Sequence, residues 1–134
     1  MTNHARFSAL LWGLSLFYLL VLSLTLLGPQ PLWYLGPLQP DTVTITDSTL
    51  STTRLHFLAF GALTLLVYHA ARSTCWPQRG VALSLLVAYS LVTECVQSFI
   101  PGRFCETGDI AANVLGILLA WIISHRTTPW PLPR

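Results

Sequence analysis

The stretch VALSLLVAYSLVTECVQSFI, residues 81–100, decides the fold of this chain. It is apolar enough, and long enough, for a membrane-spanning helix, which needs about 20 residues. Glu94 and Gln97 nevertheless lie inside it. An ionisable group at that depth costs about 2.5–3.5 kcal/mol on insertion scales, so it is normally kept only where it lines a cavity or has a partner. The stretch therefore predicts a transmembrane helix that carries a functional polar site near its end.

Three other apolar blocks, residues 7–27, 55–71 and 110–124, flank this one. Only 9% of the 134 residues are charged and 53% are hydrophobic, whereas about a quarter of an average soluble domain is charged. A water-soluble domain of this size needs a charged surface that this composition cannot supply. We therefore predict an all-α fold, an integral membrane bundle of four transmembrane helices.

The boundaries of the blocks suggest three segments. Residues 1–51 are expected to hold the first helix and an irregular outer loop, residues 52–125 three helices, and residues 126–134 a Pro/Trp-rich tail. The first block is longer than the 7–15 apolar residues of a signal peptide, so we expect it to be retained. Ser51 or Thr52 is the expected N-cap of the second helix and Thr107 that of the fourth, because hydroxyl side chains accept hydrogen bonds from free N–H groups. Pro101-Gly102 is expected to end the third helix.

Arginines near the helix ends predict the orientation, because cytoplasmic loops carry the excess of positive charge. With both termini inside, the cytoplasmic side would hold Arg6, Arg72, Arg79, Arg126 and Arg134, and the outer side only Arg54 and Arg103. We therefore predict a multi-pass membrane protein with both termini on the cytoplasmic side.

Polar side chains of three predicted helices come to one depth, close to their outer ends. Glu94 and Gln97 share a helix face because they are three residues apart. A stripe on the fourth helix is polar at first and then small, which lets a neighbouring helix approach closely. We expect a shared outer-leaflet site formed by His56, Glu94, Gln97, Arg103, Asp109 and Asn113. Gly116 and Ala120 are expected to pack the helices.

Each of these residues also has a purely structural interpretation. Asp109 could serve merely to complement the helix dipole, and Asn113 could serve merely to join two helices by a hydrogen bond. His56 could be an ordinary interfacial histidine. Glu94 could form a structural ion pair with Arg103. Glu94 is the hardest to explain in this way, because a buried carboxylate has to be protonated, paired or hydrated.

Several function classes are excluded or left without support. The arginines are spread singly and there is no lysine, so nucleic-acid binding is not expected. The three cysteines lack the spacing of a metal-binding motif. No cofactor is expected, and a divalent metal held by His56, Glu94 and Asp109 enters only as one variant of an enzyme hypothesis.

Two stretches resemble a known family. The pattern Glu94-x-x-Gln97-x-Phe99-x-Pro101-Gly102-Arg103, followed by Asp109-x-x-x-Asn113-x-x-Gly116, resembles the signature of the VanZ-like family, and His56-Phe57-Leu58-Ala59-Phe60 resembles its second-helix segment. The resemblance covers residues 52–123 and leaves out the first helix, the outer loop and the tail. Thr52 and Thr53 stand where the family commonly has Asp-Lys, and Arg54 supplies a positive charge one position along.

The resemblance implies a small, multi-pass protein of the bacterial cytoplasmic (inner) membrane and cell envelope. The founding relative of the family is associated with low-level resistance to teicoplanin. Three functions stay open. The pocket could bind a lipid-linked anion or a lipoglycopeptide, with Arg103 on the phosphate or carboxylate. It could be an enzyme for a lipid phosphate headgroup, with His56 or Glu94 as general base and Asp109 orienting the histidine. An ion relay ranks last, because no acidic residue continues inward beyond Glu94. Membrane lipids are expected partners, and the oligomeric state is left open.

Overall fold

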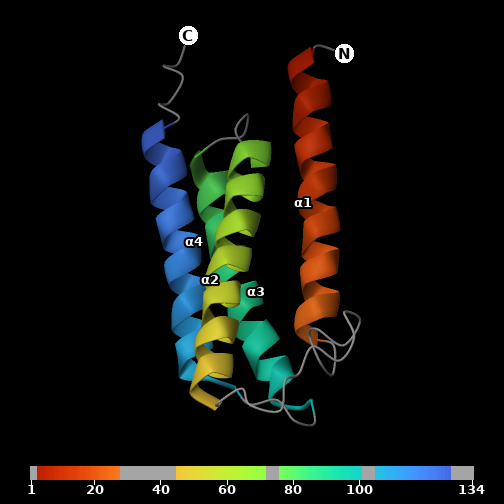
Figure 1. Cartoon of the computed structure of the whole chain (residues 1–134). Coiled ribbons are helices and arrows are strands. Elements are labelled where there is room, and N and C mark those ends of the chain that lie inside the picture. Colours follow the sequence, from red (N-terminus) through yellow and green to blue (C-terminus); the bar gives the residue numbers. More distant parts are fainter. Residues whose placement is uncertain (1–2, 28–44, 72–75, 101–104, 128–134) are drawn as a thin grey trace.

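The computed structural model describes residues 3–27, 45–71, 76–100 and 105–127. Across these ranges the chain forms four helices and no strand: α1 (Asn3–Leu27), α2 (Ile45–Ala70), α3 (Trp76–Gln97) and α4 (Thr107–Thr127). The helices run up and down in one bundle, with the beginning of α1 and the end of α4 at the same end (Figure 1). The predicted all-α class is confirmed.

Three of the helices are long and apolar enough to cross a membrane, over Arg6–Leu27, Arg79–Gln97 and Thr107–Thr127. The described part of α2 does not reach the same hydropathy, because Arg54, His56 and His69 interrupt its apolar residues. The structure thus supports a membrane protein, but the prediction of four transmembrane helices is not confirmed for α2.

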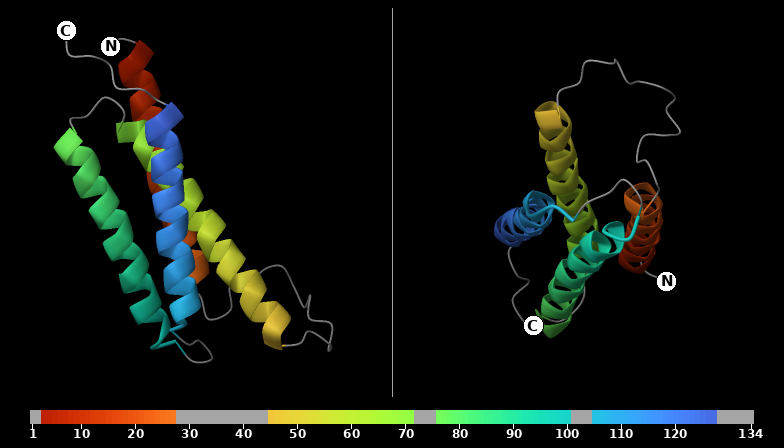
Figure 2. Two further views of the ribbon diagram at one scale, coloured as in Figure 1. Left: turned by 90° about the vertical axis from the view of Figure 1, so that its left-hand side faces the viewer. Right: turned by 90° about the horizontal axis from the view of Figure 1, so that it is seen from below.

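Helix α2 occupies the centre of the bundle and contacts α1, α3 and α4. Seen along the bundle, it lies between α1 and α4 (Figure 2, right). A helix that is covered by neighbours can carry polar side chains without exposing them to lipid. Its outer neighbour α1, in contrast, presents large apolar side chains to the surroundings, among them Phe7, Leu10, Leu16, Phe17, Leu20 and Leu24. The central position of α2 thus keeps its buried polar side chains, such as His56, away from lipid.

The start of α2 differs from the prediction. The helix begins at Ile45, so Ser51 and Thr52 lie within it and do not cap it. Part of the segment expected to be an irregular loop is thus helical, and residues 28–44 lie outside the described residues. Residues 45–54 contain neither proline nor glycine, and continuing the helix satisfies backbone N–H groups that an N-cap would otherwise have to satisfy.

The beginning of α4 is close to the predicted one. The carbonyl oxygen of Glu106 accepts hydrogen bonds from the N–H groups of Asp109 and Ile110, at 3.0 and 3.2 Å. Because the N-cap residue is the one whose carbonyl accepts the first helical bond, Glu106 takes the position expected for Thr107. Asp109 consequently lies in the first turn, where a negative charge complements the helix dipole.

Helix α3 ends at Gln97, before the predicted stop. Two tighter turns follow, in which the N–H groups of Phe99 and Ile100 donate to the carbonyl oxygens of Val96 and Gln97. Residues that precede a proline avoid the helical region, which is consistent with an early end. Pro101-Gly102 itself lies outside the described residues.

Helices α2 and α4 approach each other through glycine. A Cβ atom added to Gly116 would overlap the carbonyl oxygen of Phe57, whereas one added to Gly61 would meet the oxygen of Gly116 at an ordinary 3.5 Å. Ala120 is buried one turn further along α4. Close backbone approach of this kind favours helix association in membranes through van der Waals packing. The contact at Gly116 sets the position of α4 relative to α2 along their length. It thereby positions the polar residues at the beginning of α4 against α2.

Candidate functional site

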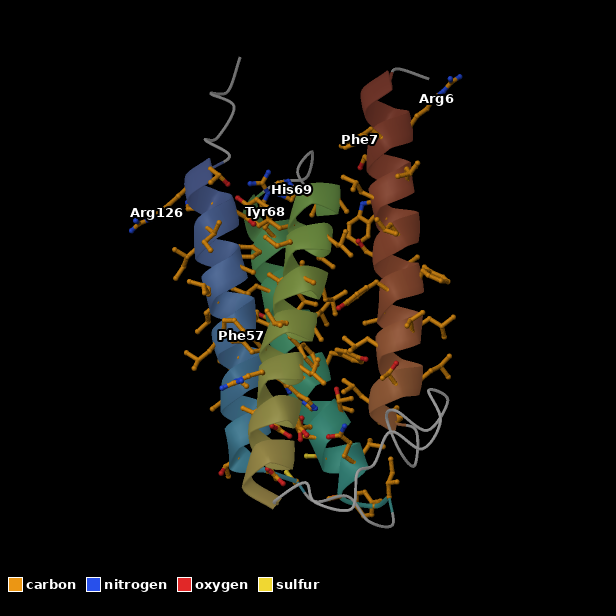
Figure 3. The ribbon with its side chains drawn as sticks, in the orientation of Figure 1. Arg6, Phe7, Phe57, Tyr68, His69 and Arg126 are labelled. Carbon is orange, nitrogen blue, oxygen red and sulfur yellow. The ribbon has the colours of Figure 1, made fainter. Side chains whose placement is uncertain are left out.

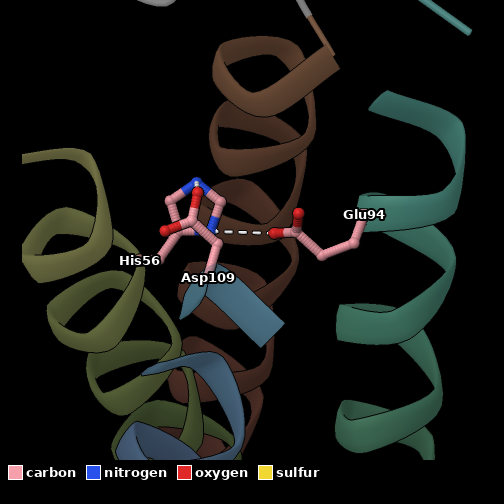
Figure 4. A group of neighbouring side chains, drawn as sticks. All are labelled: His56, Glu94 and Asp109. Carbon is pink, nitrogen blue, oxygen red and sulfur yellow. Dashed lines mark ion pairs between the residues drawn. The ribbon is translucent and has the colours of Figure 1, made fainter. Parts of the chain in front are cut away.

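Four buried polar side chains from three helices meet where α4 begins and α3 ends. We refer to His56 of α2, Glu94 of α3, and Asp109 and Asn113 of α4 as the polar cluster. Figure 4 shows His56, Glu94 and Asp109. Their exposed fractions are 2%, 0%, 5% and 0%. Polar groups hidden to this degree are normally hydrogen-bonded, because leaving one unpaired costs about 1–3 kcal/mol.

Glu94, His56 and Asn113 form a closed triangle. His56 Nδ1 lies 3.0 Å from Glu94 Oε1 and 3.2 Å from Asn113 Oδ1, and Asn113 Nδ2 donates to Glu94 Oε1 at 3.1 Å. A carboxylate oxygen and an amide oxygen both accept hydrogen bonds. Nδ1 must therefore carry a proton and donate to them, which fixes the orientation of the imidazole ring.

Asp109 faces the other nitrogen of the same ring. Its Oδ2 atom lies 4.0 Å from His56 Nε2, too far for a direct hydrogen bond. Its Oδ1 atom accepts a hydrogen bond of 2.6 Å from the hydroxyl of Thr53. The imidazole thus lies between two carboxylates, with the nearer one on Nδ1.

This arrangement can do two kinds of chemistry. A carboxylate on Nδ1 holds a histidine in the tautomer whose Nε2 can accept a proton, which is how a general base is oriented. Alternatively, one imidazole nitrogen and two carboxylate oxygens can hold a metal ion, since atoms of His56, Glu94 and Asp109 lie within 4.8 Å of one another. Among the residues that the structure describes, Glu94 Oε2 is buried without a hydrogen-bond partner, so the cluster has an acceptor that its own residues do not satisfy.

Two predicted site residues, Gln97 and Arg103, are not part of the polar cluster. Gln97 is buried, but its Nε2 donates to the carbonyl oxygen of Leu26 at 2.9 Å. It thereby satisfies one of the last carbonyls of α1, which have no helical partner. Arg103 lies outside the described residues, so its expected pairing with Glu94 stays a prediction.

Sequence reasoning missed Thr53 as a contributor to the site, along with an apolar groove beside it. The groove has a volume of about 450 Å³. It lies between the first part of α4 and the facing part of α2, and is lined by Thr53, Arg54, Phe57, Leu58, Gly108, Ala111, Ala112 and Leu115. The available signal was the spacing of Thr53 and His56, which are three residues apart and so share a helix face.

A second buried polar group lies at the opposite end of the bundle. The Arg79 guanidinium carbon is 5.3 Å from the centre of the Tyr68 ring, and Arg79 is only 4% exposed. The Tyr68 hydroxyl is 3.4 Å from His125 Nδ1, and Trp121 packs edge-on against the Tyr68 ring. Tyr68 and His69 lie near this end in Figure 3, as does Arg126 in the last turn of α4. We refer to Tyr68, Arg79, Trp121 and His125 as the aromatic end.

Comparison with known proteins identifies the family. The VanZ/LLP1 family profile matches residues 15–127. This range is wider than the predicted resemblance over residues 52–123, since it also includes the second half of α1. No curated protein and no solved structure matches the chain. The predicted family is confirmed, and this VanZ-like membrane protein belongs to the VanZ/LLP1 family.

Proposed function

We propose that this protein binds an anionic lipid, or a lipid-linked intermediate of the bacterial cell envelope, beside the polar cluster. The observation that carries the proposal is the apolar groove between α2 and α4, with exposed Arg54 among its lining residues. Phe57, Leu58 and Leu115 offer an apolar surface to an acyl or prenyl chain. A guanidinium binds a phosphate through two parallel hydrogen bonds. Groove and arginine together match a molecule with an apolar chain and an anionic head.

Thr53 connects this groove to the polar cluster. It lines the groove, and its hydroxyl donates to Asp109 Oδ1 at 2.6 Å. A headgroup held by Arg54 would therefore be one side chain away from Asp109, and Asp109 faces His56. The polar cluster can respond to such a ligand when the Thr53 hydroxyl turns toward it and releases Asp109.

The proposal includes a placement in the membrane. All four helices would cross the bacterial cytoplasmic membrane, with both termini in the cytoplasm and the groove in the outer leaflet. Arg6 and Arg126 lie at the end of the bundle opposite the polar cluster (Figure 3), as expected for the cytoplasmic side. The central position of α2 supports such a span despite its lower hydropathy, because neighbouring helices cover its buried polar side chains His56 and Thr64.

A link to teicoplanin follows from the same chemistry and belongs to this proposal. Teicoplanin carries a lipid tail and acts on the outer face of the membrane, so the groove could take the tail. Expression of the protein should then raise resistance to teicoplanin more than resistance to a glycopeptide without a lipid tail. Equal resistance to both would separate the groove from any role in resistance.

Lipid retention by the purified protein tests the binding proposal. The wild type, Arg54→Gln and the control Arg126→Gln would be incubated with polyprenyl phosphate and compared by native mass spectrometry. Arg126 is an exposed arginine far from the groove. Losing a charged hydrogen bond should weaken retention by Arg54→Gln about tenfold or more, while the control behaves as wild type. Equal retention by all three proteins would refute the proposal.

A second candidate, an enzyme acting on a lipid phosphate headgroup, is favoured by the contact between His56 Nδ1 and Glu94 Oε1. This contact leaves Nε2 as the atom that could accept a proton. Release of inorganic phosphate from a labelled lipid phosphate, lost in His56→Gln, would support catalysis. Retention of the intact lipid without any release would support binding alone.

A further inference from the structure

The charges of the polar cluster do not balance among its own residues. It contains two carboxylates, Glu94 and Asp109, against one imidazole. Among the residues that the structure describes, the ion pairs of both carboxylates are with His56 alone. Even a fully protonated imidazole would leave one net negative charge in a site whose three titratable members are all at most 5% exposed. A buried charge is stabilised by a charged partner or by a metal ion, and a buried acid that has neither is neutralised by a proton.

The hydrogen bonds of the cluster leave the same deficit. Glu94 Oε1 accepts from both His56 and Asn113, but Glu94 Oε2 is buried with no hydrogen-bond partner in the described part of the chain. Asp109 Oδ2 lies 4.0 Å from His56 Nε2, beyond the length of a hydrogen bond. The two carboxylates thus retain acceptor capacity next to the imidazole, where a cation would be stabilised.

The donor atoms are close enough to share one ion. One atom each of His56, Glu94 and Asp109 lies within 4.8 Å of the other two. Ligand atoms on a tetrahedral zinc ion are about 3.4 Å apart, given bond lengths near 2.1 Å, so movements of about an ångström would bring the three onto one ion. A divalent ion would neutralise both carboxylates and leave the histidine neutral.

We propose that the polar cluster binds one divalent first-row transition-metal ion, with His56, Glu94 and Asp109 as its protein ligands. An imidazole nitrogen among the ligands favours such an ion over magnesium and calcium, which prefer oxygen alone. Three protein ligands leave at least one coordination position for water or an anionic group, as in open zinc sites. Asn113 hydrogen-bonds two of the three ligands and acts as a positioning residue.

The metal proposal does not depend on lipid binding, and its test measures the metal directly. Purified full-length protein in detergent would be stripped with a chelator, reloaded with Zn²⁺, desalted and analysed for metal content. Co²⁺ would serve as a second probe, because its visible absorption reports the coordination geometry. Histidines can bind metal adventitiously, so the control is His125→Gln, which changes an exposed histidine at the aromatic end.

We expect one equivalent of zinc in the wild type and in His125→Gln, and little in Glu94→Gln or Asp109→Asn. Asn113→Ala should bind zinc about 10- to 100-fold more weakly, as is usual when an outer partner of a metal ligand is lost. Cobalt should give the absorption bands of a site with mixed nitrogen and oxygen ligands in the wild type. Glu94→Gln and Asp109→Asn should not give these bands. Equal zinc content in wild type and Glu94→Gln, or none in either, would overturn the proposal.

Melting temperature provides a readout that tests folding at the same time. A ligand that binds only the folded state raises the melting temperature, so Zn²⁺ should raise it in the wild type and in His125→Gln but not in Asp109→Asn. A rise that is the same in Asp109→Asn would assign the metal to another part of the chain and overturn the proposal. The polyprenyl-phosphate experiment uses Arg54→Gln, which keeps all three metal ligands, so either proposal can fail without the other.

Discussion

The two ends of α2 bury polar groups in different ways. At the polar cluster, side chains of three helices hydrogen-bond to one another, with two acids against one imidazole. At the aromatic end, the buried guanidinium of Arg79 lies over the face of the Tyr68 ring. An arginine on an aromatic ring gains a cation–π interaction, and its long side chain can reach the end of the helix. The aromatic end can thus be understood as an anchor, whereas the polar cluster has a composition that packing alone does not require.

The largest effect should come from removing the imidazole. His56→Leu removes the imidazole that pairs with both buried carboxylates, Glu94 and Asp109, and breaking a buried charged pair costs about 3–5 kcal/mol. His125→Leu, at the aromatic end, removes the 3.4 Å contact between an exposed side chain and the Tyr68 hydroxyl and should cost less than about 1 kcal/mol. Equilibrium unfolding in mixed micelles measures both. Equal losses in the free energy of unfolding for His56→Leu and His125→Leu would contradict the proposed difference between the two ends.

A smaller effect should come from the glycine contact that connects the two ends. Gly116→Ala places a methyl group against the carbonyl oxygen of Phe57, and overpacking of this kind costs about 1–3 kcal/mol. Gly61→Ala meets its neighbour at 3.5 Å and gains up to about 1 kcal/mol of helix propensity, so it should be neutral or stabilising. The same unfolding assay compares them. If Gly61→Ala were the more damaging, the helix contact would lie elsewhere.

A still smaller effect is expected for Tyr68→Phe. The substitution removes the hydroxyl near His125 but keeps the ring beneath Arg79. A single weak hydrogen bond contributes about 0.5–1 kcal/mol. Tyr68→Leu removes the ring as well and should cost more. If Phe and Leu at this position were equally destabilising, the cation–π contact would not be what stabilises Arg79.

The smallest change in stability should come from Glu94→Gln. The glutamine oxygen can still accept from His56 and Asn113, while an amide group replaces the unpartnered Oε2. We expect the free energy of unfolding to change by less than about 1 kcal/mol, measured in metal-free protein, although metal binding is lost. A large destabilisation of the metal-free protein would show that the Glu94 carboxylate stabilises the fold. The polar cluster would then have a structural role, as the aromatic end does.

Much of the fold and the composition of the cluster followed from the sequence, for identifiable reasons. The long apolar blocks predict membrane-spanning helices, and the i, i+4 spacing of Asp109 and Asn113 places these two residues on one face of α4. The start of α2 was missed because residues 45–54 have weak helix propensity, and tertiary context decides such segments. Gln97 was grouped with Glu94 by spacing, but the free carbonyl of Leu26 on α1 takes its amide. A contact to a distant helix end leaves no periodic signal in the sequence.

The apolar groove could not be predicted for a related reason. Its walls come from residues on two helices whose side chains are individually unremarkable in an apolar sequence, and its shape depends on how α2 and α4 diverge beyond Gly116. Thr53 is distinguished by its hydrogen bond to Asp109, and Arg54 by its place in the lining of the groove; neither is visible in the sequence.

Photolabelling tests the central claim, that this end of α2 and α4 is a ligand site, most directly. The protein in vesicles would be labelled with a phosphatidic acid whose acyl chain carries a diazirine, and the labelled peptides would be mapped. The account predicts labelling concentrated on Phe57, Leu58 and Leu115 and reduced by Arg54→Gln, well above that of Phe17 and Leu20 on the exposed face of α1. Labelling spread evenly over the lipid-facing residues of all helices, and unchanged by Arg54→Gln, would contradict it.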